Sequence, residues 1–179
     1  MEKPKVKAKL IFLCGFMGSG KSTIGKLAAK KAGIGFIDLD DEIVKTAGKS
    51  IPEIFAERGE GHFRQIESAT LALVVAAAAI TSDKVIIIAL GGGTIVDPKN
   101  ANTVNEFGKT VFIDCDFETC YNRIKNDPNR PLVKTEDELK NLYKIRRIAY
   151  QKYAKHTING GNEIDILADE IAEIAKGES

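Results

Sequence analysis

Apolar residues recur along the chain with two periods, one typical of buried strands and one typical of amphipathic helices. Short apolar runs predict β-strands at 10–14, 35–39, 84–89, 110–114 and 156–158. Segments with helical spacing lie between these runs and predict α-helices at 22–32, 41–47, 52–57, 62–80, 102–107, 118–125, 136–153 and 165–175. Residues 85–89 are apolar throughout, which is typical of a central parallel strand covered on both faces. The alternation of strands and helices therefore predicts an α/β fold in which helices wrap a parallel sheet.

Length and composition narrow the class of protein. The 179 residues, 44% hydrophobic and 28% charged, are expected to form one globular domain over 1–179. A net charge of +1 gives no global attraction to nucleic acid or to an anionic membrane, so neither is an expected partner. The apolar stretch Leu71–Ile80 is far shorter than the ~20 residues that span a bilayer. Three cysteines without a CxxC pair predict no disulfide framework, and hence a cytoplasmic location.

Residues 15–23 read Gly-Phe-Met-Gly-Ser-Gly-Lys-Ser-Thr and fit the phosphate-binding pattern G-x-x-x-x-G-K-[ST]. Glycines let the backbone turn its N–H groups toward phosphate oxygens, while Lys21 supplies charge and Ser22 a hydroxyl for Mg²⁺. A predicted strand precedes this loop and a predicted helix follows it, so the phosphates would lie at a helix N-terminus. The sequence therefore predicts binding of a nucleoside triphosphate.

Two aspartates follow the second predicted strand, at the edge where ligands of open α/β sheets bind. Asp38 and Asp40 are two residues apart, so on an extended segment they would face the same side. Beside bound phosphates, one carboxylate can hold Mg²⁺ through water, and the other can orient or deprotonate an attacking hydroxyl. The alternative is that such carboxylates cap the next helix, an explanation that suits Asp41 better than the pair.

Three further features suggest an anionic acceptor but leave alternatives open. Arg64 and Glu67 are three apart on a predicted helix, which fits either a surface ion pair or a guanidinium held ready for a substrate carboxylate. Glycines 91–93 end the central strand and would let a ligand approach the backbone. Arg146 and Arg147 are adjacent on the helix at 136–153, where a solvated face is the default for either one.

The segment 126–135 interrupts the regular pattern between two helices. It is polar and contains two prolines that restrict its backbone, with Arg130 between them. A loop of this kind is usually functional or disordered. We interpret the region at about 126–137 as a lid over the phosphates, with a plain connector as the alternative.

Together these motifs resemble the shikimate kinase family over residues 10–158. The resemblance rests on GFMGSGKST at 15–23, FIDLD at 36–40, the S-I-P-E-I-F and F-R-x-I-E segments within 50–67, LGGG at 90–93, NRPL at 129–132 and R-x-x-x-Y-x-x-x-A at 146–154. It implies a P-loop NTPase fold with three α/β/α layers and a five-stranded parallel sheet in the order 2-3-1-4-5. The implied reaction transfers the γ-phosphoryl group of ATP to the 3-hydroxyl of shikimate, a step in aromatic amino-acid biosynthesis, in a protein that is often a monomer.

The family's residue roles carry over position by position. The implied ATP-binding residues are Gly18, Ser19, Gly20, Lys21, Ser22, Thr23, Arg123 and Arg130, with Arg123 beside the adenine. The implied Mg²⁺ ligands are Ser22 and, through water, Asp38. The implied shikimate-binding residues are Asp40, Arg64, Gly91, Gly92, Gly93 and Arg146, and the implied shikimate-binding region is at about 38–67. Asp40, as the base, is implied to act in catalysis with Lys21 and Arg130.

Some alternatives stay open from the sequence. Arg146 is preferred to Arg147 because Tyr150 and Ala154 then follow at four and eight residues, but the adjacent pair leaves the register undecided. A gluconate kinase or an adenylate-kinase-like enzyme would share the phosphate loop but not the other motifs. A non-catalytic nucleotide-binding protein would be expected to lack residues such as Asp40 or Arg130, and both are present.

Overall fold

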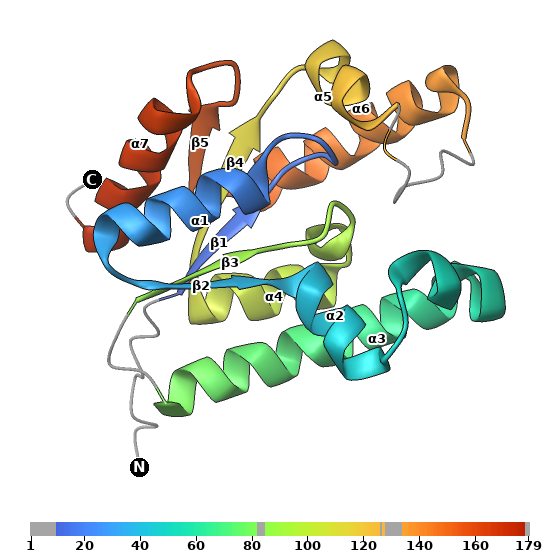
Figure 1. Ribbon diagram of the computed structural model, residues 1–179, viewed down its shortest axis with the longest axis horizontal. Coiled ribbons are helices and arrows are strands. Elements are labelled where there is room, and N and C mark those ends of the chain that lie inside the picture. Colours follow the sequence, from blue (N-terminus) through green and yellow to red (C-terminus); the bar gives the residue numbers. More distant parts are fainter. Residues whose placement is uncertain (1–9, 82–84, 126, 128–133, 178–179) are drawn as a thin grey trace.

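A parallel β-sheet forms the centre of the computed structural model, which describes residues 10–81, 85–125, 127 and 134–177. Its strands are β1 (Leu10–Cys14), β2 (Gly35–Asp38), β3 (Ile86–Ala89), β4 (Gly108–Asp114) and β5 (His156–Asn159). They are hydrogen-bonded in the order β2-β3-β1-β4-β5, and every neighbouring pair is parallel (Figure 1). The expected strand order is therefore confirmed.

Helices connect the strands and lie on both sides of the sheet (Figure 1). They are α1 (Lys21–Ala32), α2 (Leu39–Ala47), α3 (Ile51–Thr81), α4 (Pro98–Phe107), α5 (Phe117–Ile124), α6 (Glu136–Tyr153) and α7 (Ile164–Lys176), with a short 3₁₀ turn, η1, at Thr94–Val96. Helix α1 packs against α7 on one side, and α2 packs against α3 on the other. The three-layer α/β/α arrangement agrees with the sequence.

The central strand β1 shows why two helical layers are needed. Its residues alternate between two buried clusters, with Leu10, Phe12 and Cys14 in one. The intervening residues Ile11 and Leu13 belong to the other cluster, together with apolar residues of α1 and α7. Side chains of a strand point alternately to opposite faces, so an uninterrupted apolar strand must be covered twice.

Several element boundaries differ from the predictions for local reasons. The helices predicted at 52–57 and 62–80 are one assigned helix, α3, interrupted at Gly59, whose φ of 74° is not helical. Helix α4 begins at Pro98 rather than 102, because the Asp97 side chain accepts a hydrogen bond from the Lys99 N–H and proline suits the first helical turn. Strand β2 ends at Asp38, and Leu39 already belongs to α2.

Helix α3 is the one helix of the described chain whose length and composition would allow it to cross a membrane. Length and composition are weak evidence for a membrane span, because core helices of soluble proteins meet the same criteria. Leu71, Val75 and Ala78 are all at most 5% exposed and belong to the buried cluster under the sheet. The apolar character of α3 therefore serves at least in part to fill the core of the domain.

Two predictions fall partly outside the described residues. These are the lid at about 126–137, of which 127 and 134–137 are described, and the first residue of the strand predicted at 84–89. Within the described part, α6 begins at Glu136 with a capping box, in which Thr135 and Glu138 satisfy each other's backbone N–H groups. The helix after the lid segment thus has a well-defined start.

Candidate active site

The loop after β1 adopts backbone conformations that only glycine tolerates well. Gly18 and Gly20 have φ values of 81° and 91°, in the left-handed region. A Cβ on Gly18 would also lie 2.6 Å from the carbonyl oxygen of Cys120 in α5. Helix α1 starts directly after Gly20, with no capping side chain and no acidic residue in its first turn among the described residues. The N-terminus of a helix attracts anions through its N–H groups and its dipole.

Lys21 and Ser22 stand at the start of α1 with contacts that fit phosphate and metal binding. The Lys21 ammonium donates to the carbonyl oxygens of Gly15 (2.9 Å) and Phe16 (3.0 Å). The Ser22 hydroxyl donates to Oδ2 of Asp38 at the end of β2. Mg²⁺ prefers such hard oxygen donors and usually takes only one or two protein ligands besides phosphate oxygens and water. The oxygen atoms of Ser22 and Asp38 therefore fit a Mg²⁺ ion that arrives with a nucleotide.

The two aspartates share one site, but not through the extended backbone that the sequence suggested. Asp38 ends β2 and caps α2, because its Oδ1 accepts the N–H of Asp40 at 3.0 Å. Asp40 lies in the first turn of α2 rather than on a strand. The prediction of a same-face pair on an extended segment is thus wrong in its geometry, and the capping role belongs to Asp38 rather than Asp41.

A pocket of about 270 Å³ joins the phosphate loop to these carboxylates. Most of its lining consists of residues that the sequence predicts to be functional. The lining residues are Gly18, Gly20, Lys21, Ser22, Thr23, Asp38, Asp40, Leu90, Gly92, Arg123, Ile124 and Asp127. Ser19 is not among them, since its side chain is 1% exposed and buried near Gly15. Strands β1, β2 and β3 meet the pocket at their carboxyl ends, where ligands of open α/β sheets bind.

The glycines after β3 lie next to this pocket, and other predicted residues approach them closely. A Cβ on Gly91 would lie 2.8 Å from Oε1 of Glu67 and 3.0 Å from Oδ1 of Asp40. A Cβ on Gly93 would lie 2.6 Å from the guanidinium nitrogens of Arg64. The distances below 3.0 Å are ones that real Cβ atoms essentially never show. A side chain at either position would displace these charged groups, so glycine keeps Arg64, Glu67 and Asp40 in their observed places.

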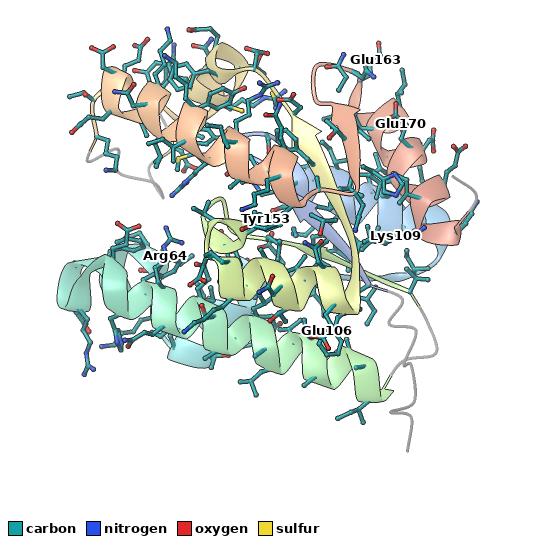
Figure 2. The ribbon with its side chains drawn as sticks, turned by 180° about the vertical axis from the view of Figure 1, so that it is seen from behind. Arg64, Glu106, Lys109, Tyr153, Glu163 and Glu170 are labelled. Carbon is teal, nitrogen blue, oxygen red and sulfur yellow. The ribbon has the colours of Figure 1, made fainter. Side chains whose placement is uncertain are left out.

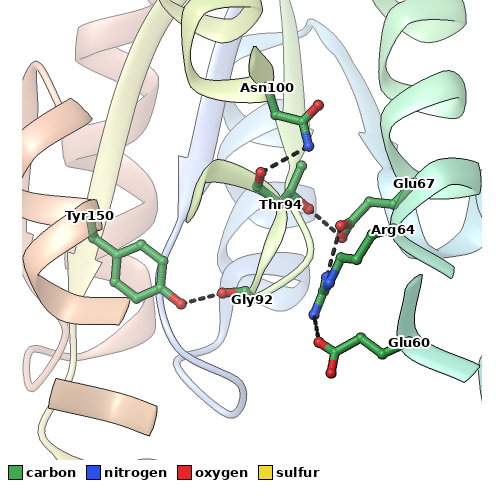
Figure 3. Close-up of polar contacts among 7 residues, drawn as sticks. All are labelled: Glu60, Arg64, Glu67, Gly92, Thr94, Asn100 and Tyr150. Carbon is green, nitrogen blue, oxygen red and sulfur yellow. Dashed lines mark hydrogen bonds and ion pairs between the residues drawn. The ribbon is translucent and has the colours of Figure 1, made fainter. Parts of the chain in front are cut away.

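Arg64 is held by carboxylates on both sides (Figure 3). Its Nη1 donates to Oε2 of Glu67 at 2.8 Å, and its Nη2 donates to Oε1 of Glu60 at 3.0 Å. Burial disfavours the charged guanidinium, but the two carboxylates outweigh burial and raise the pKa of Arg64. In Figure 2, Arg64 projects from the side of α3 that faces α6. Of the two alternatives left open by the sequence, the structure thus favours a guanidinium held in place by carboxylates over an ion pair at the surface.

Glu67 is itself anchored on its other oxygen, although it is only 1% exposed. Its Oε1 accepts the hydroxyl of Thr94 at 2.7 Å, and Asn100 donates to the Thr94 carbonyl at 3.0 Å (Figure 3). A buried carboxylate is tolerated when it is paired and hydrogen-bonded, as here. The hydrogen bonds that link Asn100, Thr94 and Glu67 therefore fix the orientation of Arg64. Residues Thr94 and Asn100 lack any motif, and sequence reasoning missed them.

The two adjacent arginines of α6 have different surroundings. Arg146 is 9% exposed, its guanidinium carbon lies 6.0 Å from the centre of the Phe16 ring, and a Cβ on Gly92 would lie 3.3 Å from its Nη1. Burial, helped by the nearby Arg64 charge, lowers the pKa of Arg146. Arg147 instead makes a two-pronged ion pair with Asp114, at 2.9 and 2.6 Å. Arg146, rather than Arg147, lies beside the glycines.

Arg123 and Arg130 complete the predicted set. Arg123 lies on α5, and its Nη1 donates to the carbonyl of Gly18 at 2.9 Å, so it borders the phosphate loop. Arg130 lies outside the described residues. Most of the predicted residues that the structure describes therefore line the pocket. The side chain of Ser19 is buried, and Arg64, Gly91, Gly93 and Arg146 lie next to lining residues without lining the pocket themselves.

Comparisons with known proteins agree on one family. A profile described as shikimate kinase matches residues 17–176. A shikimate kinase of Persephonella marina is 40% identical over 141 residues, which cover 78% of this chain and 82% of that protein. One of Caldicellulosiruptor bescii is 37% identical over 92% of this chain and 91% of that protein. The solved structure of a shikimate kinase from Acinetobacter baumannii in complex with shikimate has a TM-score of 0.85 and 32% identity, covering 95% of this chain and 94% of that one.

Proposed function

The chain belongs to the shikimate kinase family, and we propose which of its residues perform that family's reaction. The reaction is the transfer of the γ-phosphoryl group of ATP to the 3-hydroxyl of shikimate, which gives shikimate 3-phosphate and ADP. The observation that supports the residue assignment best is the meeting of two guanidinium groups at one glycine loop. Arg64 and Arg146 approach Gly93 and Gly92 respectively, next to a loop built for phosphates.

On the acceptor side, we assign the shikimate carboxylate to Arg64 and Arg146. A carboxylate has two oxygens that can each accept charge-assisted hydrogen bonds, and guanidinium groups suit that geometry. Before substrate binds, Arg64 is balanced by its own carboxylates, while Arg146 is a buried cation close to it. An incoming carboxylate next to Arg146 would favour its charged form, which burial disfavours. Asp40 and Gly91–Gly93 would contact the hydroxyls of the ring.

On the phosphate side, we assign ATP to Gly18–Thr23 and to Arg123, which borders the same loop. Lys21 would neutralise charge on the transferred group. Arg130 keeps its proposed role as a catalytic arginine of the lid at about 126–137. Ser22 and, through water, Asp38 would hold Mg²⁺, which when bound stabilises negative charge on the phosphates.

In the proposed step Asp40 is the base. The bond between the γ-phosphorus and the oxygen that bridges it to the β-phosphate breaks as a bond to the 3-hydroxyl oxygen forms. The proton of that hydroxyl passes to the Asp40 carboxylate, and ADP leaves. Because phosphoryl transfer depends mainly on positioning and charge stabilisation, the fixed side chains of the pocket are suited to it.

The remaining assignments are proposals about organisation. We propose that residues 1–179 form a single domain, with a shikimate-binding region at about 38–67. We also propose that the protein acts as a monomer in the cytoplasm, without nucleic acid or membrane partners. Sedimentation of the purified chain would test the monomer directly.

The first experiment measures ADP release from Mg-ATP in the presence of shikimate. Gluconate, AMP and a reaction without acceptor serve as parallel controls. We expect release that depends on shikimate and is lost when EDTA removes the divalent ion. Release with gluconate but not with shikimate would overturn the acceptor assignment of Arg64 and Arg146.

A further inference from the structure

Helix α6 presents two rows of side chains to two different parts of the sheet's carboxyl edge. In one row, Tyr143 donates its hydroxyl to the backbone carbonyl that follows β4, at 3.0 Å. Arg147, one turn later, forms the ion pair with the last residue of β4. Residues four apart lie on the same side of a helix, so this row anchors α6 to the end of β4.

The second row, Arg146 and Tyr150, faces the glycine loop instead. Tyr150 is 1% exposed, and its ring packs on Phe112 with centroids 5.2 Å apart. Its hydroxyl donates to the carbonyl oxygen of Gly92, the middle residue of the loop (Figure 3). Burial raises the pKa of this phenol, so it stays protonated and keeps donating throughout the working pH range. One hydrogen bond thus ties α6 to the loop that the substrate must approach.

Arg146 depends on this tie more than Arg64 does. Arg64 donates hydrogen bonds to Glu60 and Glu67, whereas the Arg146 guanidinium donates none to another described residue. Arg146 is placed by packing against Phe16 and by the backbone of α6. The interactions that hold α6 near the glycine loop therefore set the distance between Arg146 and that loop.

We propose that Tyr150 is a positioning residue for the acceptor substrate. Its hydroxyl fixes the separation between the glycine loop and Arg146, so that a carboxylate at Arg146 and hydroxyls at the loop can be bound in one molecule at the same time. This inference rests on the proposed role of Arg146. It extends that role, because Tyr150 is buried and acts on the substrate only through Arg146 and Gly92.

The test compares Tyr150→Phe with Tyr143→Phe. Both changes remove one phenol hydroxyl from the same helix and one hydrogen bond to a backbone carbonyl, and both keep the ring. We expect Tyr150→Phe to raise the KM for shikimate about 3- to 10-fold, the effect of one hydrogen bond, and to change the KM for ATP by less than about 2-fold. We expect Tyr143→Phe to change both KM values by less than about 2-fold.

A double-mutant cycle with Arg146→Met shows whether Tyr150 acts through Arg146. In the Arg146→Met background, Tyr150→Phe should raise the KM for shikimate by less than about 2-fold further. The same fold-increase in both backgrounds would overturn the proposal, because the two residues would then act independently. Equal effects of Tyr150→Phe and Tyr143→Phe would also overturn it.

The remaining outcomes are decisive as well. If Tyr150→Phe is recovered unfolded, as judged by circular dichroism, the hydroxyl serves folding rather than substrate placement and the proposal fails. If Arg146→Met leaves the KM for shikimate unchanged, the assignment of Arg146 fails and this inference fails with it. If Arg146→Met raises that KM while Tyr150→Phe does not, only the role of Tyr150 is refuted.

Discussion

The adjacent arginines of α6 allow a prediction in which removal of one lowers activity and removal of the other lowers stability. The perturbation is a matched pair of variants, Arg146→Met and Arg147→Met. Methionine keeps an unbranched apolar stem and removes the charge and the hydrogen-bond donors, so packing changes little. Arg146 is buried beside the glycine loop, whereas Arg147 is paired with Asp114 at the end of β4.

For Arg146 the expected loss falls on substrate binding. A charge-assisted hydrogen bond to a ligand contributes about 1.5–3 kcal/mol, and removal of one partner of a buried charged pair costs about 2–5 kcal/mol. A loss of about 2–4 kcal/mol corresponds to a fall of about 30- to 900-fold in kcat/KM for shikimate. The ligand-free protein should not lose stability, because burial and the Arg64 charge already disfavour the charged form of Arg146.

For Arg147 the expected loss falls on stability. The side chains of Arg147 and Asp114 are 40% and 22% exposed, so solvent screens their attraction and the pair contributes about 0.5–1 kcal/mol. In a chain of this size, that corresponds to a fall in Tm of about 1–4 °C. The KM for shikimate should change by less than about 3-fold, because this guanidinium contacts the end of β4 rather than the glycines.

The assay combines steady-state kinetics with thermal unfolding of both variants without ligands. Saturating Mg-ATP isolates the response to shikimate, and the KM for ATP serves as an internal control. A larger rise in the KM for shikimate in Arg147→Met than in Arg146→Met would refute the reasoning. So would a larger fall in Tm for Arg146→Met than for Arg147→Met.

Three other predictions concern the base, the glycine loop and the start of α6. Asp40→Asn should keep ATP binding, measured by calorimetry, while kcat falls about 10²- to 10⁴-fold; near-normal turnover would exclude it as the base. Gly93→Ala places a methyl 2.6 Å from a guanidinium and should raise the KM for shikimate, whereas Gly61→Ala, with nothing within 4 Å, should leave it unchanged. Hydrogen bonds from the backbone and side chain of Thr135 lower the pKa of Glu138. The stabilisation that this carboxylate gives to the fold is therefore complete above its unfolded pKa and is lost as the pH falls through its folded pKa. The difference in Tm between wild type and Glu138→Gln should be larger at pH 7 than at pH 3, and an equal difference would contradict this.

The fold was largely predictable because its signals are local. Strand β1 and helix α6 have the predicted bounds, since an uninterrupted apolar run and a capped amphipathic segment each specify their element over a few residues. Boundaries failed where one side chain decided them. Asp97 starts α4 early, and Asp38 ends β2 by capping α2, so that Asp40 lies on a helix.

The site was predictable where spacing encodes the chemistry, as in the phosphate loop. It was not predictable where partners are far apart along the chain. Thr94 orients Glu67 from 27 residues away, and Tyr150 binds the carbonyl of Gly92 from 58 residues away. No period or motif relates such positions. Only the packing of helices on the sheet brings them into contact.

The sequence by itself determined the order of strands and helices, the phosphate loop and the set of charged residues. These follow from hydrophobic periodicity and from motifs whose residues interact with near neighbours in the chain. The tertiary structure decided which of two adjacent arginines lies beside the glycines. Consecutive residues on a helix point about 100° apart, and the burial of Tyr150 fixes the rotation of α6, which turns Arg146 inward and leaves Arg147 to Asp114.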